Sequence, residues 1–311
     1  MLRYAVRRLI LAVPVLLGVT LITFVLMWII PGDVTQVLID PKIGTIDPEV
    51  ARAARERWGL DAPLLVRYGR YLGNIFLGDL GYSHATNEPV RDAILQRLPA
   101  TARLALAAVA ISTLLGIGMG VFTALRRGSY FDTVGMAVTL FGVSVPTFCL
   151  GLLLMWLLAV RWPLLPATGY GRGELSYLWL PAVTLGLSYA GAMARLTRSA
   201  MLDVIGADYV RTARAKGAAK RAVIWRHAVP NALIPVLTLI GIDIGNLMAG
   251  AVIAETVFAW PGVGRLLADA IQQRNLLLVQ GCVLFFAVVF VVVNVVVDLV
   301  YGLLDPRIHY D

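Results

Sequence analysis

Long apolar segments, repeated along the chain, constrain this sequence more than any other feature. An α-helix needs roughly 20 consecutive apolar residues to cross about 30 Å of hydrocarbon. Of the 311 residues 59% are hydrophobic and 15% charged, with a mean hydropathy of +0.78, which excludes a soluble globule. We therefore predict an all-α polytopic membrane protein. Its six predicted transmembrane helices are Leu9–Ile30, Ala102–Leu125, Val134–Val160, Leu178–Leu196, Leu233–Val257 and Gly281–Leu304.

Lysine and arginine are distributed unevenly between the two sides of these predicted helices. Thirteen lie before the first segment, after the second, or between the fourth and fifth, whereas the two short loops on the opposite side carry four. Short cytoplasmic loops are enriched in Lys and Arg, so both termini and the loop between the fourth and fifth segments are predicted to be cytoplasmic. The net charge of +8 is then mainly a signal of topology, and nucleic acid is not an expected partner.

Three parts follow from this pattern. Residues 1–30 are predicted to form a cytoplasmic N-terminus and the first transmembrane helix, whose apolar run is too long for a secretion signal. Residues 31–100 are predicted to form a small extracytoplasmic helical domain, with helices after Asp47 and Asp61 and from Glu88 to Leu98. Residues 101–311 would form a five-helix core.

The most distinctive part of the core is a basic segment, Asp203 to Pro230, between the fourth and fifth predicted spans. Apolar residues recur near the 3.6 period from Val204 to Ala213, which predicts a short amphipathic helix. Gly217 stands where a left-handed residue would end that helix. A second short helix is predicted from Ala218 to His227, stopped by Pro230. The segment is thus predicted to be a helical hairpin at the cytoplasmic side of the membrane.

Enzymatic sequence motifs are missing. The three lysines, Lys42, Lys216 and Lys220, do not follow a glycine, so the chain has no P-loop for ATP. The three histidines lack zinc-ligand spacing, and no G-x-S-x-G motif occurs. The two cysteines lie inside predicted spans and are interpreted as small apolar residues. We expect neither catalysis nor a metal or cofactor bound by this chain.

The hairpin resembles the coupling loop, or EAA loop, of ABC importer permeases. Ala213, Gly217 and Pro230 match the spacing of that loop, and the run DYVRTARAKG is similar to its form in the dipeptide/oligopeptide/nickel branch. Arg211 and Thr212 replace the glutamate and first alanine of the general pattern. The resemblance continues through blocks such as IPGD, WGLDAPL, GVSVPTF and AETVFAWPGVGRLL, and so covers essentially the whole chain.

This resemblance implies one transmembrane subunit of a type I ABC importer. The implied partners are a paralogous permease, two ATPase subunits that bind ATP and Mg, and an extracytoplasmic substrate-binding protein, in a prokaryotic cytoplasmic (inner) membrane. The implied substrates are di- or oligopeptides or a related small solute. Dipeptides, longer peptides, glutathione and nickel complexes are all handled by similar permeases, so the exact substrate stays open. The residues implied in ATPase coupling are Asp208, Tyr209, Arg211, Thr212, Ala213, Arg214, Lys216 and Gly217.

Ionisable residues within predicted spans are few, and each is a candidate for function. Asp243 lies near the middle of the fifth span, where it could line the substrate path, pair with a neighbouring helix or couple protons. Asp298, in the last span, is predicted to be structural. Other candidate path residues are Asn246, Pro146, which should kink or break the third span, and Asn294.

Candidate docking residues for a binding protein are Asp79, Tyr82 and Trp260; Trp260 could equally be an interface anchor or a gate residue. A stand-alone secondary transporter, driven by an ion gradient, is the alternative to an ABC subunit; a channel or membrane scaffold is a further class.

Overall fold

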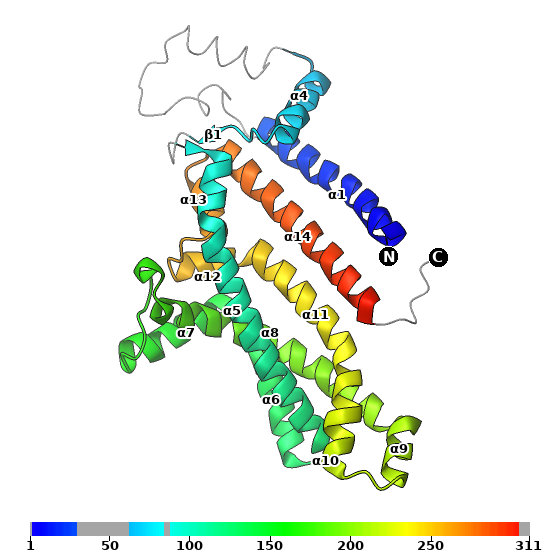
Figure 1. Ribbon diagram of the computed structural model, residues 1–311. Helices are drawn as coiled ribbons and strands as arrows, with labels where there is room; N and C mark the ends of the chain where they lie inside the picture. The colour runs from blue at the N-terminus through cyan, green and yellow to red at the C-terminus, as the bar shows by residue number, and fades with distance from the viewer. Residues whose placement is uncertain (1, 30–61, 84–87, 305–311) are drawn as a thin grey trace.

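The computed structural model describes residues 2–29, 62–83 and 88–304, which are mostly helical. Figure 1 shows long helices crossing one another, with short helices at the ends of the molecule. The helices are α1 (Leu2–Ile29), α4 (Leu64–Phe76), α5 (Val90–Leu125), α6 (Tyr130–Ser144), α7 (Thr147–Met155), α8 (Leu175–Ile205), α9 (Asp208–Ala215), α10 (Lys220–Ala222), α11 (Val229–Gly250), α12 (Val252–Val257), α13 (Val263–Gln272) and α14 (Leu276–Leu304). The remaining elements are β1 (Tyr82–Ser83), antiparallel to β2 (Glu88–Pro89), π-helical turns at Trp156–Arg161 and Val223–Ala228, and a 3₁₀ turn at Gly171–Gly173.

Helices α5 and α8 form the centre of the fold, because small residues let them approach closely. A Cβ at Gly120 would lie 2.6 Å from the carbonyl oxygen of Ala194, and one at Gly116 would meet the side chain of Met193. Larger residues at these positions would force the two helices apart. Close packing through small residues is the usual means of helix association where lipid offers no hydrophobic driving force.

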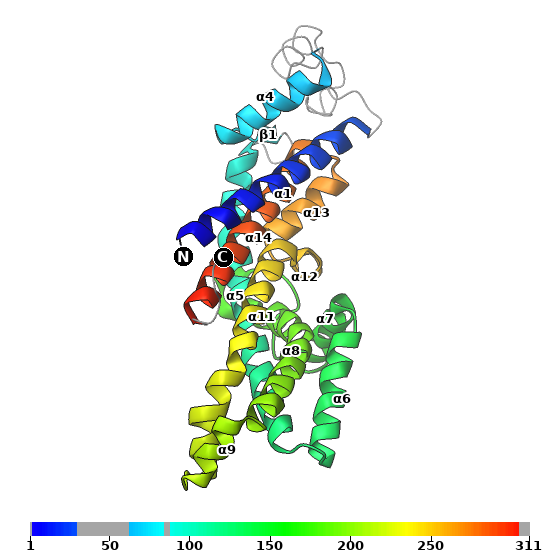
Figure 2. The same cartoon turned by 90° about the vertical axis from the view of Figure 1, so that its right-hand side faces the viewer.

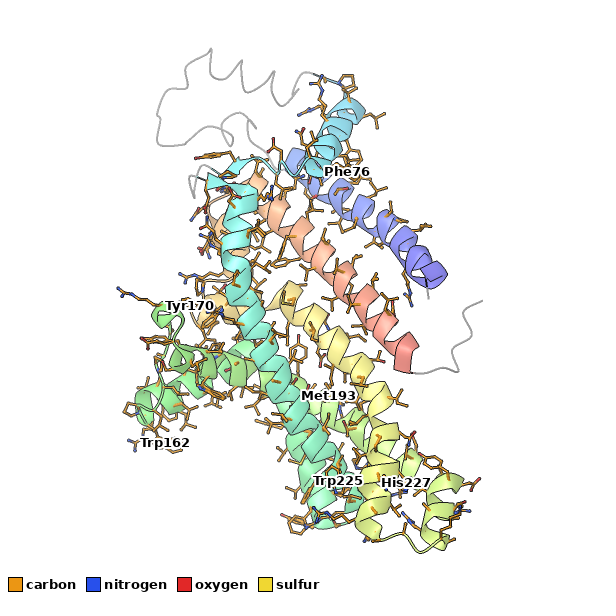
Figure 3. The ribbon with its side chains drawn as sticks, viewed as in Figure 1. Phe76, Trp162, Tyr170, Met193, Trp225 and His227 are labelled. Carbon is orange, nitrogen blue, oxygen red and sulfur yellow. The ribbon has the colours of Figure 1, made fainter. Side chains whose placement is uncertain are left out.

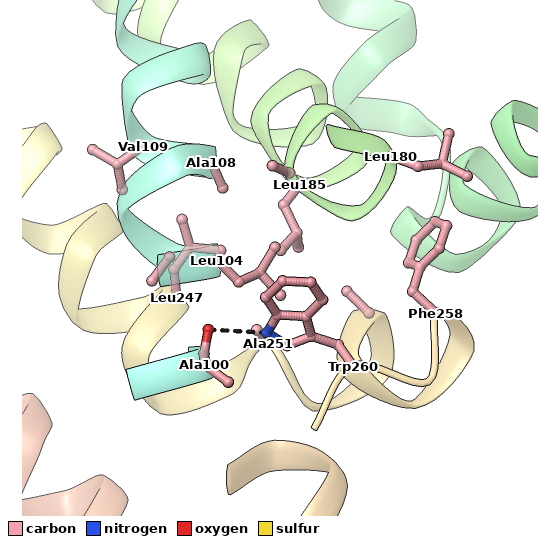
Figure 4. Close-up of a cluster of buried hydrophobic side chains, with 13 residues drawn as sticks. Ala100, Leu104, Ala108, Val109, Leu180, Leu185, Leu247, Ala251, Phe258 and Trp260 are labelled. Atoms are coloured by element: carbon pink, nitrogen blue, oxygen red, sulfur yellow. Dashed lines mark hydrogen bonds between the residues drawn. The ribbon is translucent and has the colours of Figure 1, made fainter. Parts of the chain in front are cut away.

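A cluster of buried side chains joins α5 and α8 to α11 and α12. Leu104, Leu180 and Leu247 belong to it, and each is no more than 1% exposed. Trp260, 1% exposed, closes the cluster at one end (Figure 4). Its indole Nε1 donates a hydrogen bond of 2.9 Å to the carbonyl oxygen of Ala100. The loop between α12 and α13 is therefore fixed against α5.

The predicted third span is a broken one. Helix α6 ends at Ser144, α7 begins at Thr147 directly after Pro146, and the two axes are bent by 101°. The expectation that Pro146 kinks or breaks the predicted span Val134–Val160 is confirmed. Proline lacks the N–H that would continue the hydrogen-bond ladder, and it restricts the residue before it to extended backbone. Val145 accordingly has φ −82° and ψ 125°.

Helix α1 runs beside α14 in both views (Figures 1 and 2). Arg8 Nε lies 3.1 Å from Asp298 Oδ2, and the two helices are in contact along their length. This ion pair agrees with the prediction that Asp298 is structural. At the other end of α1, the hydroxyls of Thr20 and Tyr68 lie 2.9 Å apart, which fixes α4 to the first helix.

Within residues 31–100, part of the predicted helical organisation is confirmed. Helix α4 follows Pro63 as expected, and a turn with Gly78 and Gly81 at positive φ follows it. The helix predicted after Asp47 lies outside the described residues. The helix predicted to end at Leu98 instead continues as α5, because Pro99 lies on the exposed face, where the unpaired carbonyl can be solvated.

By length and composition, three of the described helices can cross a membrane: Val90–Leu125, Lys220–Ala249 and Leu276–Leu299. They become four if α6 and α7 count as one broken span. Among the described residues of α1, the apolar part is the shorter segment Ile10–Leu26. Helix α8 has 31 residues but carries many Gly, Ser, Thr and Tyr residues, which lower its hydropathy. The structure therefore establishes a helical membrane protein without fixing the number of crossings at six.

Candidate functional site

The basic hairpin forms one end of the molecule, beyond the long helices. Helix α8 ends at Ile205, Gly206 caps it, and α9 begins at Asp208 (Figure 1). The chain then turns at Gly217 and enters α10, the π-helical turn and α11 without interruption. Figure 3 places Trp225 and His227 at this same end. The hairpin is thus attached directly to two long helices, α8 and α11.

Gly217 ends α9, as predicted. Its φ of +80° is a left-handed conformation that glycine adopts without the steric penalty of a Cβ. The N–H of Gly217 donates to the carbonyl of Arg214, and the N–H of Lys216 donates to that of Thr212, both at 3.0 Å. Asp208 in the first turn and Arg214 in the last complement the dipole of the helix.

One side of α9 is packed and the other is open. Val210 is fully buried, and the π-helical turn, which contacts α9, contributes the buried Val223. Ala213 is half-buried, whereas the Tyr209 ring is 45% exposed. Partial burial raises the pKa of the Tyr209 hydroxyl above its ordinary value. The amphipathic character predicted for the hairpin is confirmed for α9.

Positive charge dominates the open side. Residues 203–230 include six Lys or Arg residues and two Asp residues. The exposed predicted coupling residues are Asp208, Tyr209, Arg211, Thr212, Arg214, Lys216 and Gly217. Arg211 lies 3.6 Å from Asp208, but both side chains are largely exposed, so this pair is weak. In the described part of the chain Arg214 and Lys216 form no ion pair, and their charges are free to meet an acidic partner.

Two predicted details of the hairpin are wrong. Val204 and Ile205 belong to the last turn of α8, because the chain leaves the helix at Gly206 before α9 begins. Pro230 does not end a helix but lies in the first turn of α11. The preceding π-helical turn is wider than an α-helical one and so leaves room for the proline ring. The side chain of Asn231 donates to the His227 carbonyl at 2.7 Å, which satisfies an acceptor near the proline.

The base of the hairpin is anchored in an apolar cluster. Val121 and Ala124 near the end of α5 pack with Met201 of α8 and with Ala228 and Val229. All five side chains are less than 9% exposed. This cluster therefore packs the base of the hairpin against the ends of α5 and α8.

The four candidate path residues differ in exposure. Asp243 is 4% exposed, and its Oδ2 has no hydrogen-bond partner among the described residues. Asn246 and Pro146 are exposed, and the half-buried Asn294 donates to the carbonyl of Phe290 in its own helix at 2.8 Å. A shared substrate site of these residues therefore stays a prediction.

The three candidate docking residues differ in exposure. Asp79 is exposed and accepts a hydrogen bond from the N–H of Gly81, and Tyr82 is 41% exposed. Trp260 is 1% exposed within the core. The assignment of Trp260 as a docking residue is corrected to a packing residue, because its ring and its N–H are both used inside the chain.

Sequence reasoning missed an ion pair between α6 and α8. Arg198 donates from Nε to Asp132 Oδ1 and from Nη2 to Asp132 Oδ2, both at 2.8 Å. The carboxylate also accepts the N–H of Gly128 at 3.0 Å and is 6% exposed. A bidentate Arg–carboxylate pair of this kind is strong and directional. The sequence did contain a signal for this ion pair, since an aspartate and an arginine lie near the ends of two consecutive predicted spans.

A second missed residue is Glu255, which is fully buried beside the start of α13. Its carboxylate accepts hydrogen bonds from the Thr101 hydroxyl at 2.7 Å, the Arg265 N–H at 3.0 Å and the Gly264 N–H. A Cβ at Gly262 would overlap the carboxylate. Glu255 therefore caps the N-terminus of α13, where the helix dipole favours a negative charge. The glycines of the segment WPGVG were the sequence signal that another group approaches the backbone closely there.

Family models match nearly the whole chain. Residues 116–310 match the model of the binding-protein-dependent transport system inner membrane component, and residues 1–105 match the model of its N-terminal region. The chain belongs to this family of ABC importer permeases. A permease of this family is the non-catalytic translocation component, so the prediction that the chain is not an enzyme is confirmed.

Relatives of this permease carry names from peptide transport. The di/tripeptide transport system permease protein DppB of Pseudomonas aeruginosa is 44% identical over 100% of this chain and 99% of its own length. The dipeptide transport system permease protein DppB of Alkalihalophilus pseudofirmus is 38% identical over 100% of both chains. The corresponding protein of Escherichia coli K12 is also 38% identical, over 100% of this chain and 99% of its own. The predicted dipeptide/oligopeptide family is confirmed.

Solved structures share the fold of the permease. A chain of the inward-facing MetNI methionine ABC transporter matches with a TM-score of 0.54 and 16% identity, over 68% of the permease and 96% of that chain. An amino acid ABC transporter solved with histidines gives a TM-score of 0.50 and 16% identity, over 76% and 98%. At these identities the comparison establishes the fold of an ABC importer permease.

Proposed function

We propose that this permease is one of two transmembrane subunits of an ATP-driven importer of di- or oligopeptides or a related small solute. Its partners would be a paralogous permease, two ATPase subunits that hold ATP and Mg, and an extracytoplasmic binding protein. The peptide assignment is supported by relatives named as peptide permeases over their full length. The complex would lie in a prokaryotic cytoplasmic membrane.

The observation that carries the coupling role is the exposed basic face of α9. Short amphipathic helices pack on their apolar side, and here the exposed residues at the C-terminal end of α9 include Arg214 and Lys216, which form no ion pair in the described chain. A negatively charged groove on an ATPase would complement this face and would orient the two subunits as they meet. The half-buried Ala213 permits close approach, while the exposed Tyr209 adds an aromatic contact.

The mechanism follows from how the hairpin is attached. ATP binding would bring the two ATPase subunits together and shift the hairpins docked on them. Because α9 follows α8 after a two-residue break and α10 leads directly into α11, the shift would tilt both long helices. Two packed arrangements of these helices would then correspond to inward-open and outward-open states, and ATP would change their populations.

The orientation proposed for the chain places α9 and both termini in the cytoplasm. Arg126 and Arg127, at the loop between α5 and α6, would lie on the same side, in agreement with the enrichment of basic residues in cytoplasmic loops. The segment containing α4 and β1 would then be extracytoplasmic. There the exposed Asp79 and Tyr82 remain proposed contacts for a binding protein.

The residues that line the substrate path are a separate part of the proposal. Asn246, Pro146 and Asn294 could line a path formed with the second permease, and Asp243 could do so in a conformation that exposes it. A buried carboxylate without a partner is costly, so Asp243 should find water, a cation or a polar group in at least one state.

Purification of the tagged permease from its native membrane in mild detergent tests the proposal. Mass spectrometry should find a second permease and one or two P-loop ATPases in near-equal amounts. Lys216→Glu should reduce ATPase recovery, while Arg91→Gln, an exposed charge removed from the opposite end, should not. A chain recovered alone even after crosslinking would contradict the proposal and favour the ion-driven secondary transporter.

A further inference from the structure

The contact between Asp132 and Arg198 joins α8, one of the two helices attached to the hairpin, to α6, which is not attached to it. Arg198 lies on α8, ten residues before α9 begins, or about 15 Å along a helix. Asp132 lies in the first turn of α6, whose N-cap is Ser129. The two residues are separated by 66 positions in the sequence, so the pair connects distant parts of the chain.

The Asp132–Arg198 contact is a bidentate ion pair with short hydrogen bonds. Both hydrogen bonds from the Arg198 guanidinium to the carboxylate are 2.8 Å long, and the N–H of Gly128 donates to the same carboxylate at 3.0 Å. The Asp132 carboxylate is buried and the Arg198 side chain is 24% exposed. A bidentate pair fixes both the distance and the relative orientation of its two helices, whereas a single contact would fix only the distance.

Close packing continues the contact further along α6. A Cβ at Gly191 of α8 would overlap the backbone carbonyl of Thr139, so the two helices touch there through backbone. Beyond this point α6 ends at the break before Pro146, and α7 follows at 101°. A Cβ at Gly151 of α7 would lie 3.2 Å from the ring of Phe258, which belongs to the central cluster.

We propose that the Asp132–Arg198 pair makes α6 move together with α8, so that displacement of the hairpin is transmitted to the broken span α6–α7. The pair is a positioning device, because it acts on the path through the helices that it joins. This inference rests on the proposed function, since it assigns a role to the pair in coupling ATP hydrolysis to import.

Transport and ATP hydrolysis measured together in proteoliposomes test the role. The complex is isolated with its own partner subunits, and peptide uptake per ATP hydrolysed is compared among variants. Asp132→Asn should lower this ratio by about twofold to thirtyfold, the range expected for residues that modulate coupling between sites. Arg198→Lys keeps the charge but loses the bidentate geometry, and should give an intermediate value. Arg195→Gln, an exposed arginine on the same helix, is the matched control and should leave the ratio unchanged.

A distance measurement gives an independent readout. Spin labels at Tyr130 on α6 and Asp203 on α8, both exposed, are introduced as cysteines after Cys149 and Cys282 are replaced. In the otherwise unchanged complex the label distance should be equal without nucleotide and with vanadate-trapped nucleotide. In the Asp132→Asn variant it should broaden or shift between the two states.

Three results would overturn the inference. A label distance that changes with nucleotide in the unchanged pair would show that α6 and α8 move independently. A normal ratio of uptake to hydrolysis in Asp132→Asn would show that the pair is dispensable for coupling. A parallel loss of uptake, hydrolysis and complex yield would assign it to stability alone. Absence of ATP-driven uptake in the unaltered complex would instead contradict the proposed function.

Discussion

Replacement of Gly217 tests the shape of the hairpin separately from its charge. The residue has φ +80°, and a Cβ placed on it would have no heavy atom within 4 Å. A side chain introduced there would therefore meet no steric obstacle from neighbouring residues. Any loss must come from the backbone conformation itself, which makes the magnitude accessible to a simple estimate.

The expected loss of hairpin stability increases with the free energy that each side chain requires to adopt the left-handed conformation. For Gly217→Ala this conformation costs about 1–2 kcal/mol, and restriction of the open hairpin offsets about 0.4–1 kcal/mol. The net loss of about 1 kcal/mol corresponds to roughly fivefold more frequent opening of the hairpin. For the β-branched Gly217→Val about 2–3 kcal/mol is expected, or roughly 30- to 150-fold. Gly217→Asn should have the smallest effect, because Asn tolerates this region.

Hydrogen–deuterium exchange of the amides in residues 208–228 measures this opening in the purified complex. Recovery of the ATPase subunits should fall in the same order, from Asn through Ala to Val. Gly206→Ala is the matched control, since Gly206 has φ −79° and an added Cβ would lie 3.5 Å from its nearest neighbour. Equal exchange in Gly217→Val and Gly206→Ala would refute the argument that a left-handed turn shapes the hairpin.

Three further substitutions probe contacts elsewhere in the chain, with the apparent melting temperature in detergent as the measurement. Glu255→Ala leaves three buried donors without an acceptor and should destabilise by about 3 kcal/mol or more; a melting temperature equal to that of the isosteric Glu255→Gln would argue against capping of α13. Trp260→Phe removes one of the two hydrogen bonds to the carbonyl of Ala100, which still accepts the helical N–H of Leu104, and should cost about 0.5–1.5 kcal/mol, with transport of surviving complex unchanged. Arg8→Gln removes a partly exposed ion pair and should cost less than about 1 kcal/mol, so a large drop would show that α1 depends on that pair.

Features set by local backbone chemistry could be predicted from the sequence. Gly217 ends α9 and Pro146 breaks the third span because each imposes its backbone preference whatever surrounds it. The apolar side of α9 also followed from spacing, since Val210 is buried where the helical period places it. These features fix the outline of the hairpin and of the broken span.

Features that depend on tertiary partners could not be predicted. The pairing of Asp132 with Arg198 requires knowledge of which spans are adjacent, and 66 residues separate the two. Glu255 is buried because α13 presents unpaired N–H groups to it, a relation invisible in the isolated motif. The prediction that Pro230 ends a helix is wrong, because the hydrogen-bond pattern changes from π-helical to α-helical just before it.

That change of register has a consequence for sequence length in the hairpin. The π-helical turn Val223–Ala228 amounts to one extra residue relative to a continuous α-helix. Deleting a single residue within it would restore regular winding and leave the segments on either side in nearly the same orientation, because six π-helical residues turn the chain about as far as five α-helical ones. Deleting one residue from the regular part of α11 would instead rotate everything before it by about 100° around the axis of that helix. The basic residues of α9 would then point elsewhere while every charge remained in place. The π-helical turn is therefore a place where the chain can lose one residue without changing the direction in which the hairpin faces.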